Sequence, residues 1–194
     1  MPAQVQSQAP DFKGDAVVGK QFKEISLADY KGKWLVLFFY PLDFTFVCPT
    51  EITAFSDVID KFKKLDAEVV GCSVDSKFSH LAWVETPRNK GGLGDINYPL
   101  LADITKEVGR DYDVLLEAGV TLRGLYIIGP DGIIKYKLVH DLGIGRNPAE
   151  VLRVLAAIQT TEKTGEVCPT GWEPGGDTMK PDPEGSQEYF GKHG

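Results

Sequence analysis

Residues 34–40, WLVLFFY, are the feature that most constrains the fold of this 194-residue chain. Every side chain in the run is apolar or aromatic, and none is charged. The run is far shorter than the roughly 20 residues that a membrane-spanning helix needs. It is typical of a strand buried on both faces of a sheet. Residues 67–74, AEVVGCSV, predict a second strand of the same kind.

Between these two runs, the spacing of apolar residues predicts a helix. Ile52, Phe55, Ile59 and Phe62 follow one another at intervals of three, four and three residues, which places them on one helical face. A strand, a helix and a second strand in this order indicate a right-handed parallel crossover. The expected fold class is therefore α/β.

The remaining segments of the core carry weaker signals. Residues 1–20 resemble an extended lead-in, and residues 79–85 predict a further helix. Two branched runs, 122–128 and 133–139, flank a Gly-Pro-Asp-Gly turn and predict a β-hairpin. The pair Asn147-Pro148 predicts the start of another helix, because proline fits the first helical position.

The composition of the chain changes near residue 160. We expect a core of residues 1–160 and a C-terminal arm of residues 161–194, which is rich in proline and glycine. The arm keeps Cys168, Trp172 and an aromatic end, which a disordered tail rarely does. We therefore expect the arm to dock, and the whole chain to form one structural domain.

The charge balance limits the partners of the protein. The net charge is −7 and the isoelectric point is about 5.0, which argues against binding to nucleic acid or to an anionic membrane. Neither end of the sequence carries a recognisable targeting signal. The expected location is the cytoplasm, where disulfides are transient rather than structural.

Cys48 is the sharpest chemical feature. It follows the first strand and precedes the predicted helix, and Pro49 in the first helical position places Cys48 at the N-cap. Glu51 lies in the first turn, where acidic side chains are favoured. Free N–H groups and the helix dipole stabilise a thiolate there, which is the nucleophilic form of cysteine. The alternative is a buried, inert cysteine.

The other candidate residues are ambiguous when taken singly. Cys72 lies within a strand run and is expected to be a buried core thiol. Cys168 in the arm can be a surface thiol, and Arg123 can be a surface charge on an edge strand. The cysteines lie far apart, there is no C-x-x-C pair and the histidines are scattered, so a zinc site is not expected.

Taken together, four motifs resemble those of the typical two-cysteine peroxiredoxins. Residues 39–51, FYPLDFTFVCPTE, contain the active-site pattern P-x-x-x-T-x-x-C as Pro41, Thr45 and Cys48. Residues 166–169, EVCP, resemble the motif around the resolving cysteine. The two regulatory motifs of that subgroup are matched by Gly91, Gly92, Leu93 and Gly94, and by Tyr189 and Phe190.

The resemblance implies a thioredoxin-like fold, with a central mixed sheet flanked by helices, and a peroxidase activity. Cys48 is then the nucleophile that reduces hydrogen peroxide and small organic hydroperoxides. Pro41 shields it from water and Thr45 orients the substrate. Arg123 stabilises the thiolate, Glu51 orients Arg123, and Arg146 supports this network.

The resemblance also implies how the cycle closes. Cys168 of the partner subunit attacks the Cys48 sulfenic acid, so the working unit is a homodimer, and five dimers can form a ring. Thioredoxin or a similar dithiol reduces the disulfide, and no metal, haem or flavin is needed. The GGLG motif and the Tyr189-Phe190 pair are expected to pack over the first turn of the helix at Cys48 and to slow its unwinding.

Two further hypotheses remain open on the sequence. A dithiol–disulfide oxidoreductase of the thioredoxin kind would share the fold, but residues 49–51 after Cys48, PTE, lack the second cysteine that it needs. A holdase chaperone or a redox-signalling partner is a secondary role, because oxidised members of the family can act in this way.

Overall fold

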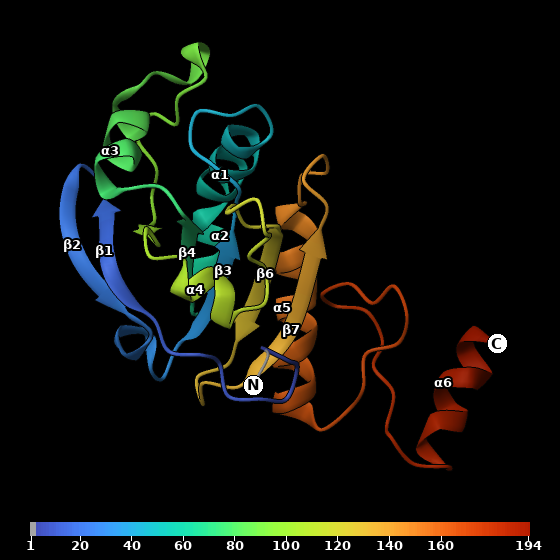
Figure 1. Ribbon diagram of the computed structural model, residues 1–194. Helices are drawn as coiled ribbons and strands as arrows, with labels where there is room; N and C mark the ends of the chain where they lie inside the picture. Colours follow the sequence, from blue (N-terminus) through green and yellow to red (C-terminus); the bar gives the residue numbers. More distant parts are fainter. Residues whose placement is uncertain (1–2) are drawn as a thin grey trace. The chain divides into compact units, whose positions relative to one another are not determined.

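The computed structural model describes residues 3–194 and contains two compact units, Met1–Arg146 and Asn147–Gly194 (Figure 1). The predicted division into a core of residues 1–160 and an arm of residues 161–194 stays a prediction. In the chain itself, the helix that precedes the arm groups with the C-terminal unit.

The first unit is built around a seven-stranded mixed sheet in the order β2-β1-β5-β4-β3-β6-β7 (Figure 1). The three neighbouring strands β5, β4 and β3 run parallel, and the remaining pairs are antiparallel. The strands are β1 Lys13–Val18, β2 Gln21–Ser26, β3 Trp34–Phe39, β4 Ala67–Ser73, β5 Leu100–Ala102, β6 Arg123–Ile128 and β7 Ile134–His140. The predicted α/β fold with a central mixed sheet is confirmed.

Strand β3 is the centre of this sheet, as its sequence predicts. All six of its residues are buried, and it pairs in parallel with β4 through Leu37 and Val70. On one side, the Phe38 ring stacks on Phe55 with centroids 5.0 Å apart. Tyr98 meets the same Phe38 ring edge-on at 5.8 Å. Aromatic packing therefore joins β3 to the helix that follows it.

The predicted helix between β3 and β4 is two helices, α1 Cys48–Asp57 and α2 Ile59–Lys64. The backbone leaves the helical region at Val58, where φ is −109° and ψ is 13°. Val58 is β-branched and has a low helix preference, and its N–H bonds to the Ser56 carbonyl instead of continuing the helix. The predicted apolar stripe nevertheless packs inward, because its four residues are all buried.

The expectation of an extended lead-in at residues 1–20 is wrong for residues 13–20, and its first two residues lie outside the described part of the chain. Residues 13–26 form the β1–β2 hairpin, in which Val17 pairs with Phe22 around a turn at Gly19. Most residues of β2 are exposed, so this edge of the sheet has no continuous apolar run to mark it in the sequence. The second hairpin, β6–β7, forms as predicted, and Gly132 N–H closes its turn on the Gly129 carbonyl.

Four shorter helical segments complete the first unit: η1 Leu27–Tyr30, α3 Lys77–Glu85, η2 Arg88–Lys90 and α4 Glu107–Asp111. The predicted helix at residues 79–85 is confirmed as part of α3. Its N-terminus is capped by Ser76, whose hydroxyl accepts from the Ser79 N–H at 3.2 Å.

The second unit begins with α5 Pro148–Thr164. Asn147 caps this helix by accepting from the Ala149 N–H at 2.9 Å, and Pro148 fills the first position, as predicted.

The arm is more ordered than its composition suggests. Val167 and Met179 form an antiparallel bridge, and α6 Gly185–His193 follows it. The Asp182 carboxylate accepts from the Gly185 N–H at 2.7 Å, which supports the start of α6.

None of the helices that the structure describes in residues 3–194 is long and apolar enough to cross a membrane.

The segment after η2 is held closely against α3. Trp83 Nε1 donates to the Gly91 carbonyl at 2.9 Å, and the Leu93 N–H donates to the Trp83 carbonyl at 3.0 Å. A Cβ atom on Gly92 would overlap the backbone carbonyl of Thr86. A side chain at position 92 therefore requires movement of the backbone.

We predict that Gly92→Ala lowers the free energy of unfolding by about 1–3 kcal/mol or more, because the overlap cannot be relieved by a side-chain rotation. Gly143→Ala is the matched control, since a Cβ there meets nothing within 4 Å and should change stability by less than about 0.5 kcal/mol. Urea unfolding of the two variants checks this. Equal stabilities would contradict the close packing of Gly92.

Candidate active site

Cys48 begins α1 and is completely buried. The helix starts one residue earlier than predicted, because Val47 already has helical backbone angles and serves as the N-cap. Its carbonyl accepts from the N–H groups of Thr50 and Glu51. Cys48 is therefore the first helical residue and Pro49 the second. The thiol still lies in the first turn, where the helix dipole favours negative charge.

Arg123 lies beside this thiol. Its Nη1 donates to the Cys48 Sγ at 3.4 Å and to the Glu51 carboxylate at 2.6 Å, and its Nε donates to the Leu142 carbonyl at 2.8 Å. The side chain is buried, since Arg123 is only 3% exposed. The alternative of a surface charge on an edge strand is wrong, because β6 lies between β3 and β7.

The register of the sheet explains why Arg123 reaches Cys48. Strand β6 runs antiparallel to β3, with Leu125 opposite Phe38. Arg123, two residues before Leu125, therefore lies beyond the C-terminal end of β3. That end is where the chain leads through residues 40–47 to Cys48.

Arg146 binds the other side of the Glu51 carboxylate. Its backbone N–H and its Nε each donate to Oε1 at 2.7 Å, and its Nη2 donates to Oε2 at 3.1 Å. The guanidinium also lies over the Phe38 ring, 5.1 Å from the centroid. The structure thus brings Glu51, Arg123 and Arg146 into one buried group, which we call the charged triad.

The charged triad determines the electrostatics around the thiol. Burial raises the pKa of Glu51, but hydrogen bonds and charge from Arg146, together with the charge of Arg123, lower the pKa below its usual range overall. One carboxylate against two guanidinium groups leaves one positive charge in excess. Arg123 presents that charge to the Cys48 sulfur.

The loop between β3 and α1 carries two other predicted site residues. Pro41 is buried directly after β3. Thr45 is half-buried, and its hydroxyl donates to the Leu42 carbonyl at 2.9 Å. The structure therefore places both residues in the segment that leads to Cys48, and their roles stay predictions.

A buried network that the sequence did not indicate holds this loop. The Asp43 carboxylate accepts from the Tyr40 hydroxyl at 2.9 Å and lies 2.8 Å from Nδ1 of His80. The Nε2 of His80 faces the Leu101 carbonyl at 3.2 Å. His80 lies in α3, and no spacing rule links a histidine there to the loop, so only the tertiary structure reveals the contact.

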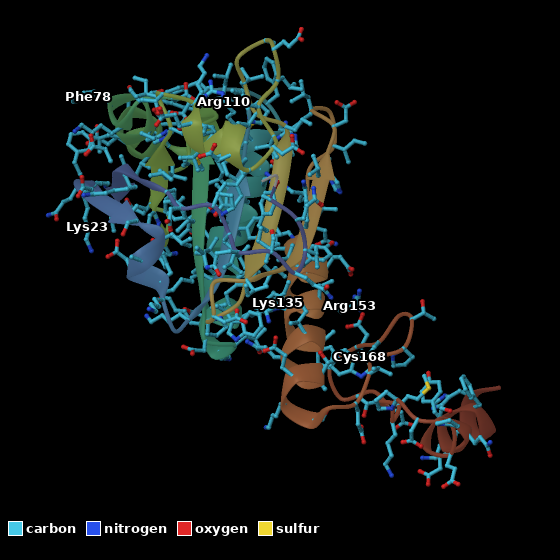
Figure 2. The ribbon with its side chains drawn as sticks, turned by 60° about the horizontal axis from the view of Figure 1, so that its bottom comes forward. Lys23, Phe78, Arg110, Lys135, Arg153 and Cys168 are labelled. Carbon is cyan, nitrogen blue, oxygen red and sulfur yellow. The ribbon has the colours of Figure 1, made fainter. Side chains whose placement is uncertain are left out.

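The remaining cysteines have different surroundings. Cys168 lies in the C-terminal unit, after α5, and is half-buried with its sulfur 3.7 Å from the Ala157 carbonyl. Figure 2 labels Cys168 and Arg153 among the side chains of this unit. Burial raises the pKa of Cys168, and the positive charge of Arg153 opposes this. Burial raises the pKa of Cys72 well above its usual range, so Cys72 is a protonated core thiol, as predicted.

The structure places the two predicted regulatory motifs as follows. Gly91, Gly92, Leu93 and Gly94 form the loop bound to α3, and Arg88 Nε donates to the Leu93 carbonyl at 3.0 Å. Tyr189 and Phe190 lie in α6, where the Tyr189 ring stacks on His193 with centroids 4.3 Å apart. Their regulatory roles stay predictions.

Comparisons with known proteins agree with this geometry. The AhpC/TSA family matches residues 5–137, and the C-terminal domain of 1-Cys peroxiredoxin matches residues 157–192, a segment that contains Cys168 here. Peroxiredoxin-2 of Rattus norvegicus is 57% identical over 192 residues, which are 98% of this chain and 97% of the relative. The crystal structure of reduced Plasmodium vivax 2-Cys peroxiredoxin has a TM-score of 0.95 and 48% identity, and covers 98% of this chain and 100% of that one.

The name of a further relative includes both a cell compartment and the protein on which its activity depends. The thioredoxin-dependent peroxide reductase of Mus musculus, named as mitochondrial, is 60% identical over 189 residues, which are 97% of this chain and 74% of the relative. One relative is thus named as mitochondrial, whereas the name of the rat relative gives no compartment. The expected cytoplasmic location of this chain stays a prediction.

We predict that Glu51→Gln destabilises the fold by about 3–5 kcal/mol at neutral pH, because it leaves two buried guanidinium groups without their counterion. The pKa of Glu51 is lowered in the folded state, so the carboxylate contributes stability that is present above its ordinary pKa of 4.5 and is lost as the pH falls through the folded pKa. The difference between the wild type and the variant should therefore shrink in acid.

Urea unfolding at neutral pH and at about pH 3 measures this difference. Glu150→Gln is the control, because Glu150 forms an ion pair with Arg153 that is partly exposed to solvent, and such pairs contribute about 0–1 kcal/mol. A Glu51→Gln effect as small as the control, or one that grows in acid, would contradict the charged triad.

Proposed function

Because the chain belongs to the peroxiredoxin family and is a thiol-dependent peroxidase, we propose that Cys48 is the residue that attacks the peroxide. The observation that carries this proposal is the hydrogen bond from Arg123 to the Cys48 sulfur within a buried group of net positive charge. A thiolate held in this way is ready to react. The thioredoxin-type dithiol mechanism is not supported, because Cys48 has no neighbouring second cysteine.

In the first step, the Cys48 thiolate attacks the terminal oxygen of a hydroperoxide. A sulfur–oxygen bond forms, the O–O bond breaks, and the leaving alkoxide or hydroxide takes up a proton to give an alcohol or water. Cys48 is oxidised to a sulfenic acid and the peroxide is reduced. The fixed charge of Arg123 stabilises the negative charge that moves onto the oxygens in the transition state.

Thr45 and Pro41 assist this step because both lie in the loop that leads to Cys48. The Thr45 hydroxyl can both donate and accept a hydrogen bond, so it orients the peroxide oxygens in front of the thiolate. Pro41 is buried beside the loop and limits the access of water. Hydrogen peroxide and small organic hydroperoxides are the proposed substrates, since the thiol is completely buried in the fold and leaves little room for a bulky group.

In the second step, Cys168 of the partner subunit attacks the Cys48 sulfenic acid. A disulfide forms between the two sulfurs, and the hydroxyl leaves as water. Burial raises the pKa of Cys168 in the folded arm, so release of the arm favours its thiolate form. The proposed unit is a homodimer, and five such dimers can assemble into a ring.

A dithiol donor closes the cycle by thiol–disulfide exchange. Two electrons and two protons from the donor return Cys48 and Cys168 to thiols, and the donor becomes a disulfide. We propose thioredoxin or a similar dithiol protein, because a mouse relative carries thioredoxin dependence in its name.

We predict that one equivalent of hydrogen peroxide converts the reduced protein into a disulfide-linked dimer on a non-reducing gel, with the loss of two thiols per disulfide. Cys48→Ser should lose no thiol and show no peroxidase activity. Cys168→Ser should still form the sulfenic acid but no dimer. Cys72→Ala is the control and should behave like the wild type, because Cys72 is a core thiol.

The outcomes separate the parts of the proposal. A monomer band with the same thiol loss would place the disulfide within one chain and overturn the role of the partner subunit. Unchanged thiols in the wild type would overturn Cys48 as the peroxide-reactive residue.

We also propose that α6, which carries Tyr189 and Phe190, slows the unwinding that brings Cys48 to Cys168. A sulfenic acid that waits longer is more exposed to a second peroxide, which oxidises it to the inactive sulfinic acid. Removal of residues 185–194 should therefore raise the peroxide concentration that inactivates the enzyme during turnover. The rate of the first oxidation of Cys48 is the internal control, and an inactivation curve that does not move would contradict this role of α6.

A further inference from the structure

Two consecutive residues, Asn97 and Tyr98, hold the middle of α1 and not its beginning. The Tyr98 hydroxyl donates to the Ile52 carbonyl at 2.7 Å. Asn97 donates twice to the Ser56 hydroxyl, from its backbone N–H and from its Nδ2, each at 3.1 Å. These bonds come from the segment that connects the Gly91–Gly94 loop to β5, so their anchor lies outside the charged triad.

Ile52 and Ser56 are themselves partners in the helix. In an α-helix, the carbonyl of one residue accepts from the N–H four residues later, which pairs the Ile52 carbonyl with the Ser56 amide. Tyr98 therefore binds the backbone carbonyl of one of these two residues, and Asn97 binds the side-chain hydroxyl of the other. Ile52 and Ser56 are also almost completely buried, so this point of α1 is fixed by packing as well.

Tyr98 is suited to act as a fixed donor. It is 4% exposed and packs edge-on against Phe38, which stacks in turn on Phe55 of α1. Burial raises the pKa of Tyr98 well above its usual range, so the hydroxyl keeps its proton and its role as a donor.

The first turn of α1 is held by a different kind of interaction. Cys48 and Glu51 are bound by the guanidinium groups of Arg123 and Arg146. Pro49 has no N–H to contribute to the helix. The hold on this turn is therefore mainly electrostatic, whereas the hold at Ile52 and Ser56 consists of neutral hydrogen bonds and aromatic packing.

We propose that Tyr98 is a positioning residue that ends the unwinding of α1 at Ile52 during the catalytic cycle. The inference rests on the proposed function, because the disulfide step requires Cys48 to leave its site. Unwinding residues 48–51 removes the acceptors of the amides at 52–55. The bond between the Ser56 amide and the Ile52 carbonyl is then the first one retained, and the Tyr98 hydroxyl holds the Ile52 carbonyl in place.

The test is Tyr98→Phe, which removes the hydroxyl and keeps the ring. Tyr112→Phe is the matched control, because the hydroxyl of this fully buried tyrosine donates to the Pro10 carbonyl at 2.8 Å, away from α1. Both variants therefore lose one hydrogen bond from a buried tyrosine to a backbone carbonyl. Their melting temperatures measure how much stability this loss costs in each variant.

Amide hydrogen exchange of the full-length, disulfide-linked dimer locates the end of the unwinding. In the wild type and in Tyr112→Phe, we expect fast exchange for residues 52–55 and protection from Ser56 onward. In Tyr98→Phe, exchange at Ser56 should be about two- to tenfold faster, as expected for the loss of one hydrogen bond.

Stopped-flow kinetics separates the two chemical steps. The rate constant for oxidation of Cys48 by hydrogen peroxide should be the same in all three proteins. The rate constant for disulfide formation should rise about two- to tenfold in Tyr98→Phe alone, because a longer stretch of helix can open. Ser56→Ala removes the acceptor of Asn97 and should change the same rate constant in the same direction.

The results distinguish the role of Tyr98 in the unwinding of α1 from the proposed peroxidase function. Failure of Cys48 to react in the wild type would overturn the peroxidase assignment of this residue. Normal oxidation, with both the Ser56 exchange and the disulfide rate equal in Tyr98→Phe and Tyr112→Phe, would overturn the role of Tyr98 and leave the peroxidase proposal intact.

Discussion

The buried pairing of Glu51 with Arg123 and Arg146 is the interaction on which the site depends. A charge inside a fold is costly unless it is paired and hydrogen-bonded. Glu51 meets this condition with both oxygens, since each accepts at least two hydrogen bonds. Because two cations share one anion, the triad keeps a positive charge that faces the Cys48 sulfur. The same contacts thus satisfy a structural need and support the proposed role of Cys48 as the nucleophile.

The fold serves mainly to bring the three members of this triad together. Glu51 lies in α1 after β3, Arg123 opens β6, and Arg146 follows β7. Strand β6 is an antiparallel neighbour of β3, so its first residue lies at the C-terminal end of β3. The β6–β7 hairpin then carries the chain back to Arg146. The topology of the sheet, more than any local motif, therefore creates the charge around Cys48.

Local patterns in the sequence are sufficient to predict two central strands, one hairpin and the start of one helix. Strands β3 and β4, the β6–β7 hairpin and the start of α5 are where their patterns predict them. The β1–β2 hairpin was missed because an edge strand needs no continuous apolar run. Within the site, the position of Cys48 at the start of a helix singles it out, and the resemblance to a family supplies its expected role together with Thr45 and Arg123. The buried partners His80 and Tyr98 were not predictable, because their contacts join segments with no common spacing.

Helix α1 is held by charged groups at its first turn and by neutral hydrogen bonds in its middle. Oxidation of Cys48 in the proposed cycle affects these two sets of contacts differently. A Cys48 thiolate is attracted by Arg123, so the first turn is held most firmly before the reaction. Oxidation to the sulfenic acid replaces the anion by a neutral group and removes much of this attraction. The hydrogen bonds at Ile52 and Ser56 involve no charge and are unaffected. In the proposed cycle, the reaction therefore loosens only the turn that carries the cysteine, while the rest of the helix keeps its place in the core. Such a division confines the opening to the residues that have to move and leaves the charged triad able to re-form around the thiolate after reduction.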